Sequence, residues 1–402
     1  MTIDLSAPEL RANPYPLFRR LRREDPVTYL GKSYSGPAWL LTRYDDIVAT
    51  LKDHRFSSDR RVLSEGGGPM DAWWMPKLFR AFQDSMVLVD DPDHWRLRNL
   101  VHKAFTPQMI RRLEPRIEAI SHELLDAAAT KETVDLIADF ALPLPLTVIS
   151  EMMGVPEEDR LKFHQWSANF LDLAFDKPLE LLPQLPSMVR MNRFFKRLVR
   201  LRQNHPADDL ITALVQAEEA GDRLNEDELV AMLFLLLLAG HETTVNLIGN
   251  GTLALLENSD QMAKLRAQPE LMDSAVEELL RFTNPVESIA PRYALEDVVI
   301  RDQPISRGET ILLAIASANR DETVFDHPEE LDIERHPNKH VAFGLGMHYC
   351  LGAPLARLEG QIAFRVLLER YPALSLAVAP DQLEWRKSAA VRGLRALPIR
   401  LQ

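Results

Sequence analysis

The chain has 402 residues, of which 46% are hydrophobic and 26% are charged, and its 47 Lys and Arg against 59 Asp and Glu give a net charge of −12. This is the composition of a globular protein that can bury a large core. The acidic balance disfavours non-specific nucleic-acid binding and a polybasic membrane anchor. A single cysteine, Cys350, excludes intramolecular disulfides and multi-cysteine zinc or iron–sulfur sites. Cys350 can be a core residue, an exposed thiol, a nucleophile or the sole protein ligand of a metal.

The ends and apolar runs of the chain predict a cytoplasmic protein without a membrane anchor. Met1–Leu10 has neither a basic region nor a continuous apolar stretch, so it is unlike a signal peptide. The longest apolar run, Leu229–Gly240, has twelve residues. Because a spanning helix needs about 20, this run predicts a buried core helix.

The predicted elements are mostly helical. Asn225, with Glu228 three residues later, indicates a capping box at the start of the apolar helix. The pattern predicts a mainly α protein with a small β portion, forming one domain over residues 1–402. In chain order we expect strands Val27–Tyr29 and Ala38–Thr42; helices Pro107–Ala129, Leu161–Phe175, Met188–Asn204, Asp208–Ala220, Asn225–Asn258 and Pro269–Phe282; strands Val298–Ile300 and Thr310–Leu313; helix Ala353–Arg370; and strands Leu374–Val378 and Ala396–Leu401.

The sole cysteine lies in a glycine-rich loop just before a predicted helix. Gly344, Gly346 and Gly352 allow positive φ and close approach of a large flat group. The start of the helix at Ala353 favours a thiolate, because free N–H groups and the helix dipole point toward it. A cysteine hydrolase remains an alternative, although it requires a correctly placed histidine and an Asn or Asp.

The run Phe-Gly-x-Gly-x-His-x-Cys-x-Gly at residues 343–352 resembles the haem-ligand loop of the cytochrome P450 family. The resemblance extends over nearly the whole chain, from Asn13 to Leu394, and implies the P450 fold with haem b as cofactor. It implies that Cys350 is the axial thiolate of the haem iron, in a loop that ends at Gly352. It also implies that Phe343 packs near the porphyrin and that His348 faces a haem propionate.

Glu278 and Arg281 are three residues apart on one predicted helix face, which alone is typical of a surface ion pair. Arg335 lies in the stretch that leads to the cysteine loop. The arrangement resembles the family's Glu–Arg–Arg cluster, which implies a structural role for Glu278, Arg281 and Arg335.

The apolar helix continues into Ala239-Gly240-His241-Glu242-Thr243-Thr244. Alone, this segment is typical of a helix whose buried face ends at His241. It also resembles the family's oxygen-activation motif, which implies that Ala239 and Gly240 open a groove for dioxygen. Glu242 and Thr243 would then supply protons. Glu242 stands where many family members carry Asp.

His94 and Arg98 are four residues apart and share a helix face. Alone, this pair is typical of a solvated basic surface. In the family this spacing binds a haem propionate, and Arg292 matches the third basic anchor. The resemblance therefore implies that His94, Arg98, Arg292 and His348 balance the two propionates.

The resemblance also indicates where substrate contacts lie. The positions are all apolar, so they favour a hydrocarbon substrate, although each is equally compatible with core packing. They are Met86, Val87, Leu238, Ala239, Val286, Ile289, Ala290, Ala390 and Val391. Similarity to macrolide hydroxylases and to the acyl-cleaving enzyme of biotin synthesis suggests a polyketide or macrolide, terpenoid, steroid or fatty-acyl substrate. Three glycines at 66–68 suggest that Met70–Met75 belongs to a mobile entrance loop, although Trp73 and Trp74 are equally compatible with covering the core.

The chain has no flavin or nicotinamide fingerprint and no ferredoxin-type cysteines. We therefore expect electrons from a separate ferredoxin and ferredoxin reductase. Two groups of cations predict a basic docking face: Arg96, Lys103, Arg111 and Arg112, and Arg335, Lys339, His340 and Arg357.

The resemblance implies a monomeric haem-thiolate monooxygenase, which inserts one oxygen atom of dioxygen into an apolar substrate, usually by C–H hydroxylation. The alternatives are a haem-binding gas sensor or carrier and a cysteine hydrolase. The sensor or carrier would need no proton relay, and the hydrolase would need no haem.

Overall fold

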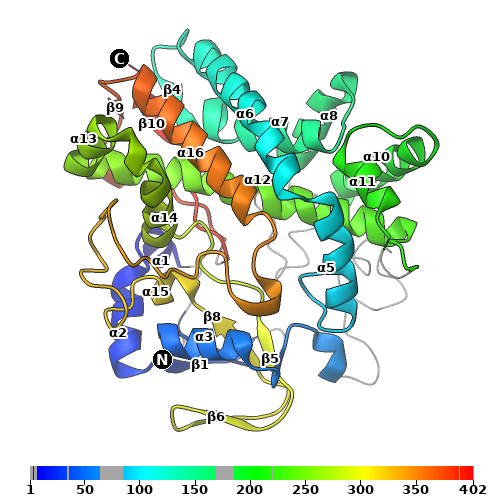
Figure 1. Ribbon diagram of the computed structural model, residues 1–402. Helices are drawn as coiled ribbons and strands as arrows, with labels where there is room; N and C mark the ends of the chain where they lie inside the picture. Colours follow the sequence, from blue (N-terminus) through cyan, green and yellow to red (C-terminus); the bar gives the residue numbers. More distant parts are fainter. Residues whose placement is uncertain are drawn as a thin grey trace.

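The longest helix, α12 (Glu226–Glu257), crosses the middle of the molecule and is buried along most of its length (Figure 1). The predicted capping box begins it: the Asn225 side chain accepts hydrogen bonds from the N–H groups of Asp227 and Glu228 at 3.0 and 2.9 Å, and the Asn225 N–H donates to the Glu228 carboxylate at 2.8 Å. Gly251 allows close packing against the next layer, because a Cβ there would lie 2.5 Å from the Phe364 ring. Other helices therefore pack directly onto α12.

The computed structural model describes residues 3, 7–33, 36–63, 85–168, 185–218, 221–388 and 390–401. The predicted entrance loop Met70–Met75 and the end of the predicted helix Leu161–Phe175 lie outside these residues. Besides α12, the described α-helices are α1 (Pro8–Ala12), α2 (Tyr15–Glu24), α3 (Tyr44–Lys52), α5 (Asp93–Ala104), α6 (Pro107–Ala128), α7 (Pro143–Met152), α8 (Glu157–Ala168), α10 (Leu185–Asn204), α11 (Leu210–Gln216), α13 (Ser259–Ala267), α14 (Met272–Thr283), α15 (Ile315–Ala318) and α16 (Ala353–Arg370). Shorter turns are η1 (Arg60–Leu63), η3 (Ile137–Ala141, a π-helix), η5 (Pro269–Leu271), η6 (Gly346–His348) and η7 (Pro380–Gln382).

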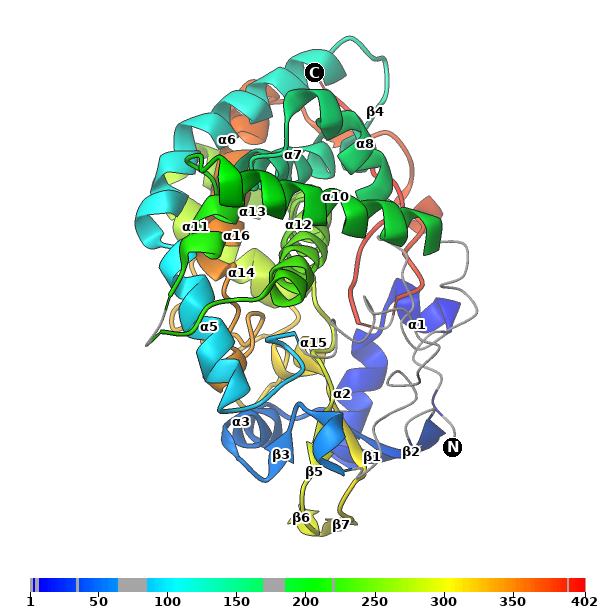
Figure 2. The same cartoon turned by 90° about the vertical axis from the view of Figure 1, so that its right-hand side faces the viewer.

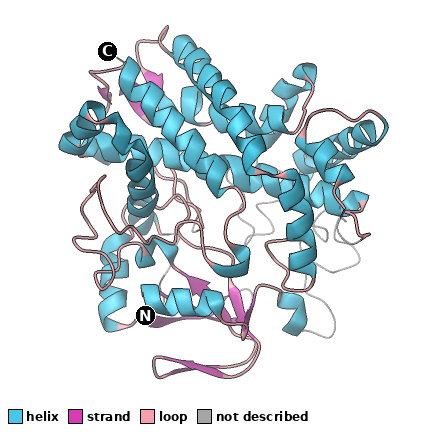
Figure 3. Ribbon diagram, in the orientation of Figure 1, coloured by secondary structure: helices cyan, strands magenta, loops and turns pink. Residues whose placement is uncertain are grey.

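Most strands lie at one end of the molecule, below the helices in Figure 3. The described strands are β1 (Val27–Ser33), β2 (Gly36–Leu41), β3 (Phe56–Ser57), β4 (Val134–Asp135), β5 (Arg292–Ala294), β6 (Val298–Ile300), β7 (Gln303–Ile305), β8 (Thr310–Leu313), β9 (Ser375–Leu376) and β10 (Pro398–Arg400). Of these, β4, β9 and β10 lie near the C-terminus at the opposite end (Figure 1). The largest sheet has the order β1-β2-β8-β5-β3, with β2 and β8 parallel. The other two are β4-β10-β9, which joins the C-terminus to the helical part, and the hairpin β6-β7. The chain is thus mainly α with a small β portion in a single domain, as predicted.

Most predicted elements form within a few residues of their expected bounds, and α16 matches them fully. Two helices differ. The predicted helix Asp208–Ala220 is α11, which begins after Asp209 because that side chain caps it by accepting from the Thr212 N–H at 2.8 Å, and which ends as Ala217 turns extended. The predicted helix from Pro269 begins as the short 3₁₀ turn η5, and α14 starts only at Met272.

One described helix, α12, is long and apolar enough to cross a membrane, but 67% of its most apolar window is buried inside the molecule. A core helix of a folded domain has this character, so α12 gives only weak support for a membrane span. Its apolar side chains belong to a core that also includes α6, α7, α10, α14 and α16.

Candidate active site

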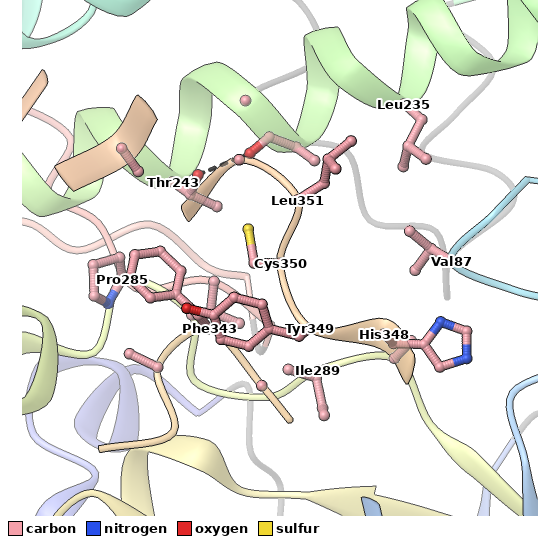
Figure 4. Close-up of a pocket in the computed structure, with 18 of the residues that line it drawn as sticks. Val87, Leu235, Thr243, Pro285, Ile289, Phe343, His348, Tyr349, Cys350 and Leu351 are labelled. Atoms are coloured by element: carbon pink, nitrogen blue, oxygen red, sulfur yellow. Dashed lines mark hydrogen bonds between the residues drawn. The ribbon is translucent and has the colours of Figure 1, made fainter. Parts of the chain in front are cut away.

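The cysteine loop turns back under α12, and the Cys350 side chain points toward that helix in Figure 4. The Cys350 N–H donates to the Phe343 carbonyl at 3.0 Å, which closes the loop. Gly344 and Gly346 have φ of 68° and 72°, as predicted, because the chain must reverse there. Gly352 does not: its φ is −80°, and it instead stands at the start of α16. Gly352 therefore does not use the conformational freedom that a glycine allows there.

The Cys350 thiol is largely shielded from solvent, and backbone N–H groups point toward its sulfur. Burial raises the pKa of the Cys350 thiol, while the backbone N–H groups of Gly352 and Ala353 and the charges of Arg98 and Arg357 oppose that rise. A hydrolase nucleophile needs a depressed pKa. The net rise at Cys350 is opposite to that requirement, whereas a metal ion would bind the thiolate form directly.

A cavity of about 370 Å³ lies between the Cys350 sulfur and α12. Most of the predicted site residues line it: Met86, Val87, His94, Arg98, Ala239, Gly240, Thr243, Val286, Ile289, Ala290, Arg292, Phe343, His348, Cys350 and Gly352. Its remaining wall includes Leu235 and Leu236 of α12. Leu238 does not line this cavity, because the helical repeat turns Leu235 and Leu236 toward it instead.

Ala390 and Val391 of the C-terminal turn do not line this cavity either, but they contact residues next to it. The Ala390 carbonyl accepts from the N–H groups of Glu287 and Ser288 at 2.8 and 3.2 Å, and Val391 forms a β-bridge with Val286. Together these contacts support the lining segment 286–290 from outside.

A buried ion cluster holds the C-terminal turn against the segment 286–290. The Glu287 carboxylate pairs with Arg11, and its other oxygen lies 3.6 Å from Arg392. Arg392 also donates to the carbonyls of Arg11 and Ala12 and stacks on the Trp385 ring at 3.6 Å. The N-terminal helix, the cavity wall and the C-terminal turn are therefore joined through one carboxylate.

Four basic side chains converge on the cavity near the cysteine loop. The His94 and His348 rings lie 4.5 Å apart, and Arg98 donates to the Tyr349 carbonyl at 2.8 Å. Arg292 donates to the Ala290 carbonyl at 3.0 Å. His348 has its own partners, with Nε2 3.0 Å from the Ser58 hydroxyl and 3.5 Å from the Asp90 carboxylate.

Burial disfavours the charged forms of these basic side chains. Burial lowers the pKa of Arg98, Arg292 and His94, the last to about 4, and His348 and Arg98 depress the His94 pKa further. The Nε2 atom of His94 is buried and has no hydrogen-bond partner among the described residues. A bound anion at this position would relieve both costs.

Above the sulfur, α12 presents Thr243 and a small-residue stretch. The Thr243 hydroxyl donates to the Ala239 carbonyl at 2.8 Å, and the Thr244 hydroxyl donates to the Gly240 carbonyl at 3.3 Å (Figure 4 shows Thr243). Such back-bonding weakens the local helix ladder. Glu242 is half-buried and does not line the cavity.

Four polar residues that line the cavity in the described part of the chain were not predicted from the sequence: Thr244, Ser288, Tyr349 and Glu359, of which Glu359 is the one carboxyl. Glu359 of α16 is buried, lines the cavity, and has its pKa raised to about 8 by burial, opposed by a hydrogen bond with Thr244. It is protonated near neutral pH, so it can donate a hydrogen bond. The signal was present: Glu359 falls on the apolar stripe of α16, four residues after Leu355 and three before Ile362.

The predicted structural cluster is assembled at the end of α14. Arg281 donates twice to the Glu278 carboxylate, both at 2.7 Å, and Arg335 donates to it at 3.1 and 3.2 Å. Asn338 and the Asp332 N–H complete the set at 3.1 and 3.0 Å. Glu278 and Arg281 are fully buried, so each charge is compensated without water.

The family model for cytochrome P450 matches residues 17–388. The chain is 46% identical over 399 residues to the polyketide biosynthesis cytochrome P450 PksS of Bacillus subtilis, covering 98% of this chain and 97% of that protein. It is 42% identical over 403 residues to the monooxygenase PikC of Streptomyces venezuelae, covering 99% and 94%. The PksS structure superposes with a TM-score of 0.92 and 44% identity over 100% of both chains. P450BioI, in complex with an acyl carrier protein ligated to hexadec-9Z-enoic acid, superposes with 0.89 and 38% identity over 99% and 100%.

The chain belongs to the cytochrome P450 family. It is therefore a monooxygenase that uses haem iron and dioxygen and takes its electrons from redox partners. The site observed here fits that cofactor. A partly buried cysteine sulfur faces an apolar cavity, and the orphaned His94 Nε2 and the desolvated Arg98 and Arg292 stand where an anionic edge would compensate them.

The basic surface expected on this P450 has fewer unpaired cations than the sequence indicates. Several of its cations are already paired: Arg357 and His340 bind Glu277 at 2.6 and 3.0 Å, Arg335 binds Glu278, Arg96 binds Glu228, and Lys103 donates to the Glu218 carbonyl at 2.6 Å. Arg111, Arg112 and Lys339 remain as exposed cations. Spacing alone could not reveal this pairing, because each of these partners is distant in the chain from its cation.

Proposed function

We propose that this P450 hydroxylates a C–H bond of a long acyl or polyketide chain, with Cys350 as the axial thiolate of haem b. The observation that carries the proposal is the Cys350 sulfur facing an apolar cavity roofed by Ala239, Gly240 and Thr243. When bound, the haem activates dioxygen, so that one oxygen atom enters the substrate and the other is reduced to water.

The basic side chains hold the cofactor. His94, Arg98, Arg292 and His348 bind the two propionates through charge-assisted hydrogen bonds, and burial makes such bonds stronger than they are in water. Phe343 packs beside the cysteine loop, and its ring lies under the Arg357 guanidinium at 4.6 Å. The N–H groups of Gly352 and Ala353 offset the negative charge of the sulfur.

Proton delivery falls to α12. Thr243 lines the cavity on the side that faces Cys350, and its hydroxyl can exchange the Ala239 carbonyl for a ligand oxygen. Glu242, which follows the small-residue stretch and is half-buried, passes protons from solvent toward Thr243. Ala239 and Gly240 leave room for a diatomic ligand, since neither carries a bulky side chain.

The substrate contacts are apolar. Met86 and Val87 precede α5, and Val286, Ile289 and Ala290 form the opposite wall, so the cavity favours a hydrocarbon chain. The relatives support the same class, since one serves polyketide biosynthesis and another was solved with a C16 acyl group on an acyl carrier protein. We propose that the substrate of this chain is likewise delivered as an acyl carrier protein thioester.

A ferredoxin with its reductase is the proposed electron source. Arg111, Arg112 and Lys339 are exposed cations, which would steer an acidic ferredoxin. The rate of reduction should then fall as ionic strength rises, and a rate independent of salt would contradict this docking mode. We also propose that the enzyme is a cytoplasmic monomer, which size-exclusion chromatography and cell fractionation test.

The proposal is tested by the reduced carbon-monoxide difference spectrum. The unaltered protein should show the strongly red-shifted Soret band of a thiolate-ligated haem, and Cys350→Ala should lose it while the fold is kept. A folded, haem-loaded protein without that band contradicts the thiolate assignment. A screen for substrate-induced spin-state change across fatty acids, macrolides, terpenoids and steroids then tests the substrate class, and a response to steroids alone contradicts it.

A further inference from the structure

All charged side chains of helix α10 are positive, although the net charge of the protein is −12. Its twenty residues include six Lys or Arg and no Asp or Glu. Arg190, Arg193, Arg197 and Arg200 follow one another at spacings of three, four and three residues, so they lie on one helix face. All four are exposed. We call this row the α10 arginine stripe; at about 1.5 Å per residue it is about 15 Å long.

The stripe is only partly neutralised. Arg197 pairs with Asp159 of α8, and Arg200 lies 3.1 Å from Glu226, yet both guanidinium side chains remain at least 60% exposed. Arg190 and Arg193 have no ion-pair partner among the described residues. Exposed ion pairs contribute little and are readily exchanged, and each guanidinium has five N–H donors. The stripe can therefore bind another set of anions.

The stripe stands outside the roof of the active site. In Figure 2, α10 crosses the face turned to the viewer, in front of α12. The two helices are in contact, with the Phe195 and Phe234 rings 5.1 Å apart and edge to face. Phe234 immediately precedes Leu235, which lines the cavity. The cysteine loop is instead flanked by α3 and α5, so an electron donor near the thiolate would not use this helix.

We propose that the α10 arginine stripe is the docking surface for the acidic acyl carrier protein that presents the substrate. This inference rests on the carrier-bound substrate proposed above. Guanidinium groups bind carboxylates and the phosphate of a phosphopantetheine arm in bidentate geometry. Val189 and Leu201, 42% and 37% exposed on the same helix, supply apolar contacts beside the cations.

The test compares two forms of one acyl chain. The probes are an acidic bacterial acyl carrier protein loaded with a hexadecenoyl chain and free hexadecenoic acid, each titrated into the holoenzyme while the haem spin state is followed. The readout is the Kd of the acyl carrier protein form divided by the Kd of the free acid. Arg190→Glu with Arg193→Glu should raise that ratio about tenfold or more. The matched control is Arg20→Glu with Arg307→Glu, which reverses two exposed arginines on α2 and after β7.

The expected ratio for the control equals that of the unaltered enzyme, and the stripe's effect should shrink at high salt. An equal ratio in the stripe variant overturns the docking surface. So does loss of binding to vesicles containing phosphatidylglycerol with no change in the ratio, since the stripe would then serve a lipid surface. The reduced carbon-monoxide spectrum and oxidation of the free acid are measured in the same samples. They fail only if the proposed function is wrong.

Discussion

Glu359→Gln should make the stability of this enzyme less dependent on pH. Glu359 is a buried carboxyl whose pKa is raised to about 8 from an ordinary 4.5, mainly by burial. Between these two values the folded protein holds a proton that the unfolded chain releases. Stability is therefore fully retained below about pH 4.5 and is lost as the pH rises toward 8. Glutamine keeps the shape of the neutral acid and carries no proton to lose.

The size of the effect follows from the same two values. A rise from 4.5 to about 8, at about 1.36 kcal/mol per pH unit, corresponds to up to about 5 kcal/mol. Near pH 5 the variant and the unaltered enzyme should differ by no more than about 1 kcal/mol, because both side chains are neutral and their hydrogen bonding is similar. By pH 9 the variant should be the more stable by several kcal/mol.

The assay is urea unfolding of the holoenzyme at pH 5, 7 and 9, followed by circular dichroism and by haem absorbance. Glu369→Gln is the matched control, because Glu369 is exposed on the same helix, α16. Its midpoint should follow that of the unaltered enzyme at every pH. Parallel pH profiles for Glu359→Gln and the unaltered enzyme would refute the reasoning, since the buried carboxyl would then not be the group that couples proton binding to folding.

Three further predictions concern other parts of the molecule. Thr243→Ala should keep the haem spectrum but lower product formed per NADH consumed by about tenfold, and unchanged coupling would remove Thr243 from proton delivery. Arg335→Leu should cost about 3–5 kcal/mol in urea unfolding because it leaves Glu278 under-compensated, and a loss below about 1 kcal/mol would show that Arg281 alone suffices. Gly251→Val should lower stability by about 1–3 kcal/mol by collision with Phe364, and an unchanged melting temperature would contradict that close packing.

Local signals predicted the fold where one pattern decided the outcome. The capping box at Asn225 and the loop before Ala353 fixed the starts of α12 and α16, because side-chain chemistry at those positions favours one backbone conformation. The sheet was less accessible. The two-residue strand β3 has too few residues to show alternation, and its pairing with β5 joins segments far apart in the sequence.

Site residues that belong to a sequence motif could be predicted, whereas those whose position depends on tertiary packing could not. Cys350 and Thr243 line the cavity and Leu238 does not, because only the tertiary contacts of α12 decide which side of that largely apolar helix faces Cys350. Distant acidic residues such as Glu277 likewise pair with some of the cations near the thiolate, so fewer unpaired cations remain there than the sequence indicates. Sequence spacing carries no information on either point.

Two kinds of buried titratable group among the described residues bear on the assigned site. Glu278 is surrounded by two guanidinium groups, an amide and a backbone N–H, so its charge is compensated and its role is structural. Glu359 and His94 are desolvated without such compensation, and burial shifts the pKa of each toward its neutral form. Both line the cavity at Cys350. Desolvated titratable groups gather where a ligand or a reaction needs them, so Glu359 and His94 support the functional role of the cavity that they line, whereas Glu278 belongs to the frame that holds it.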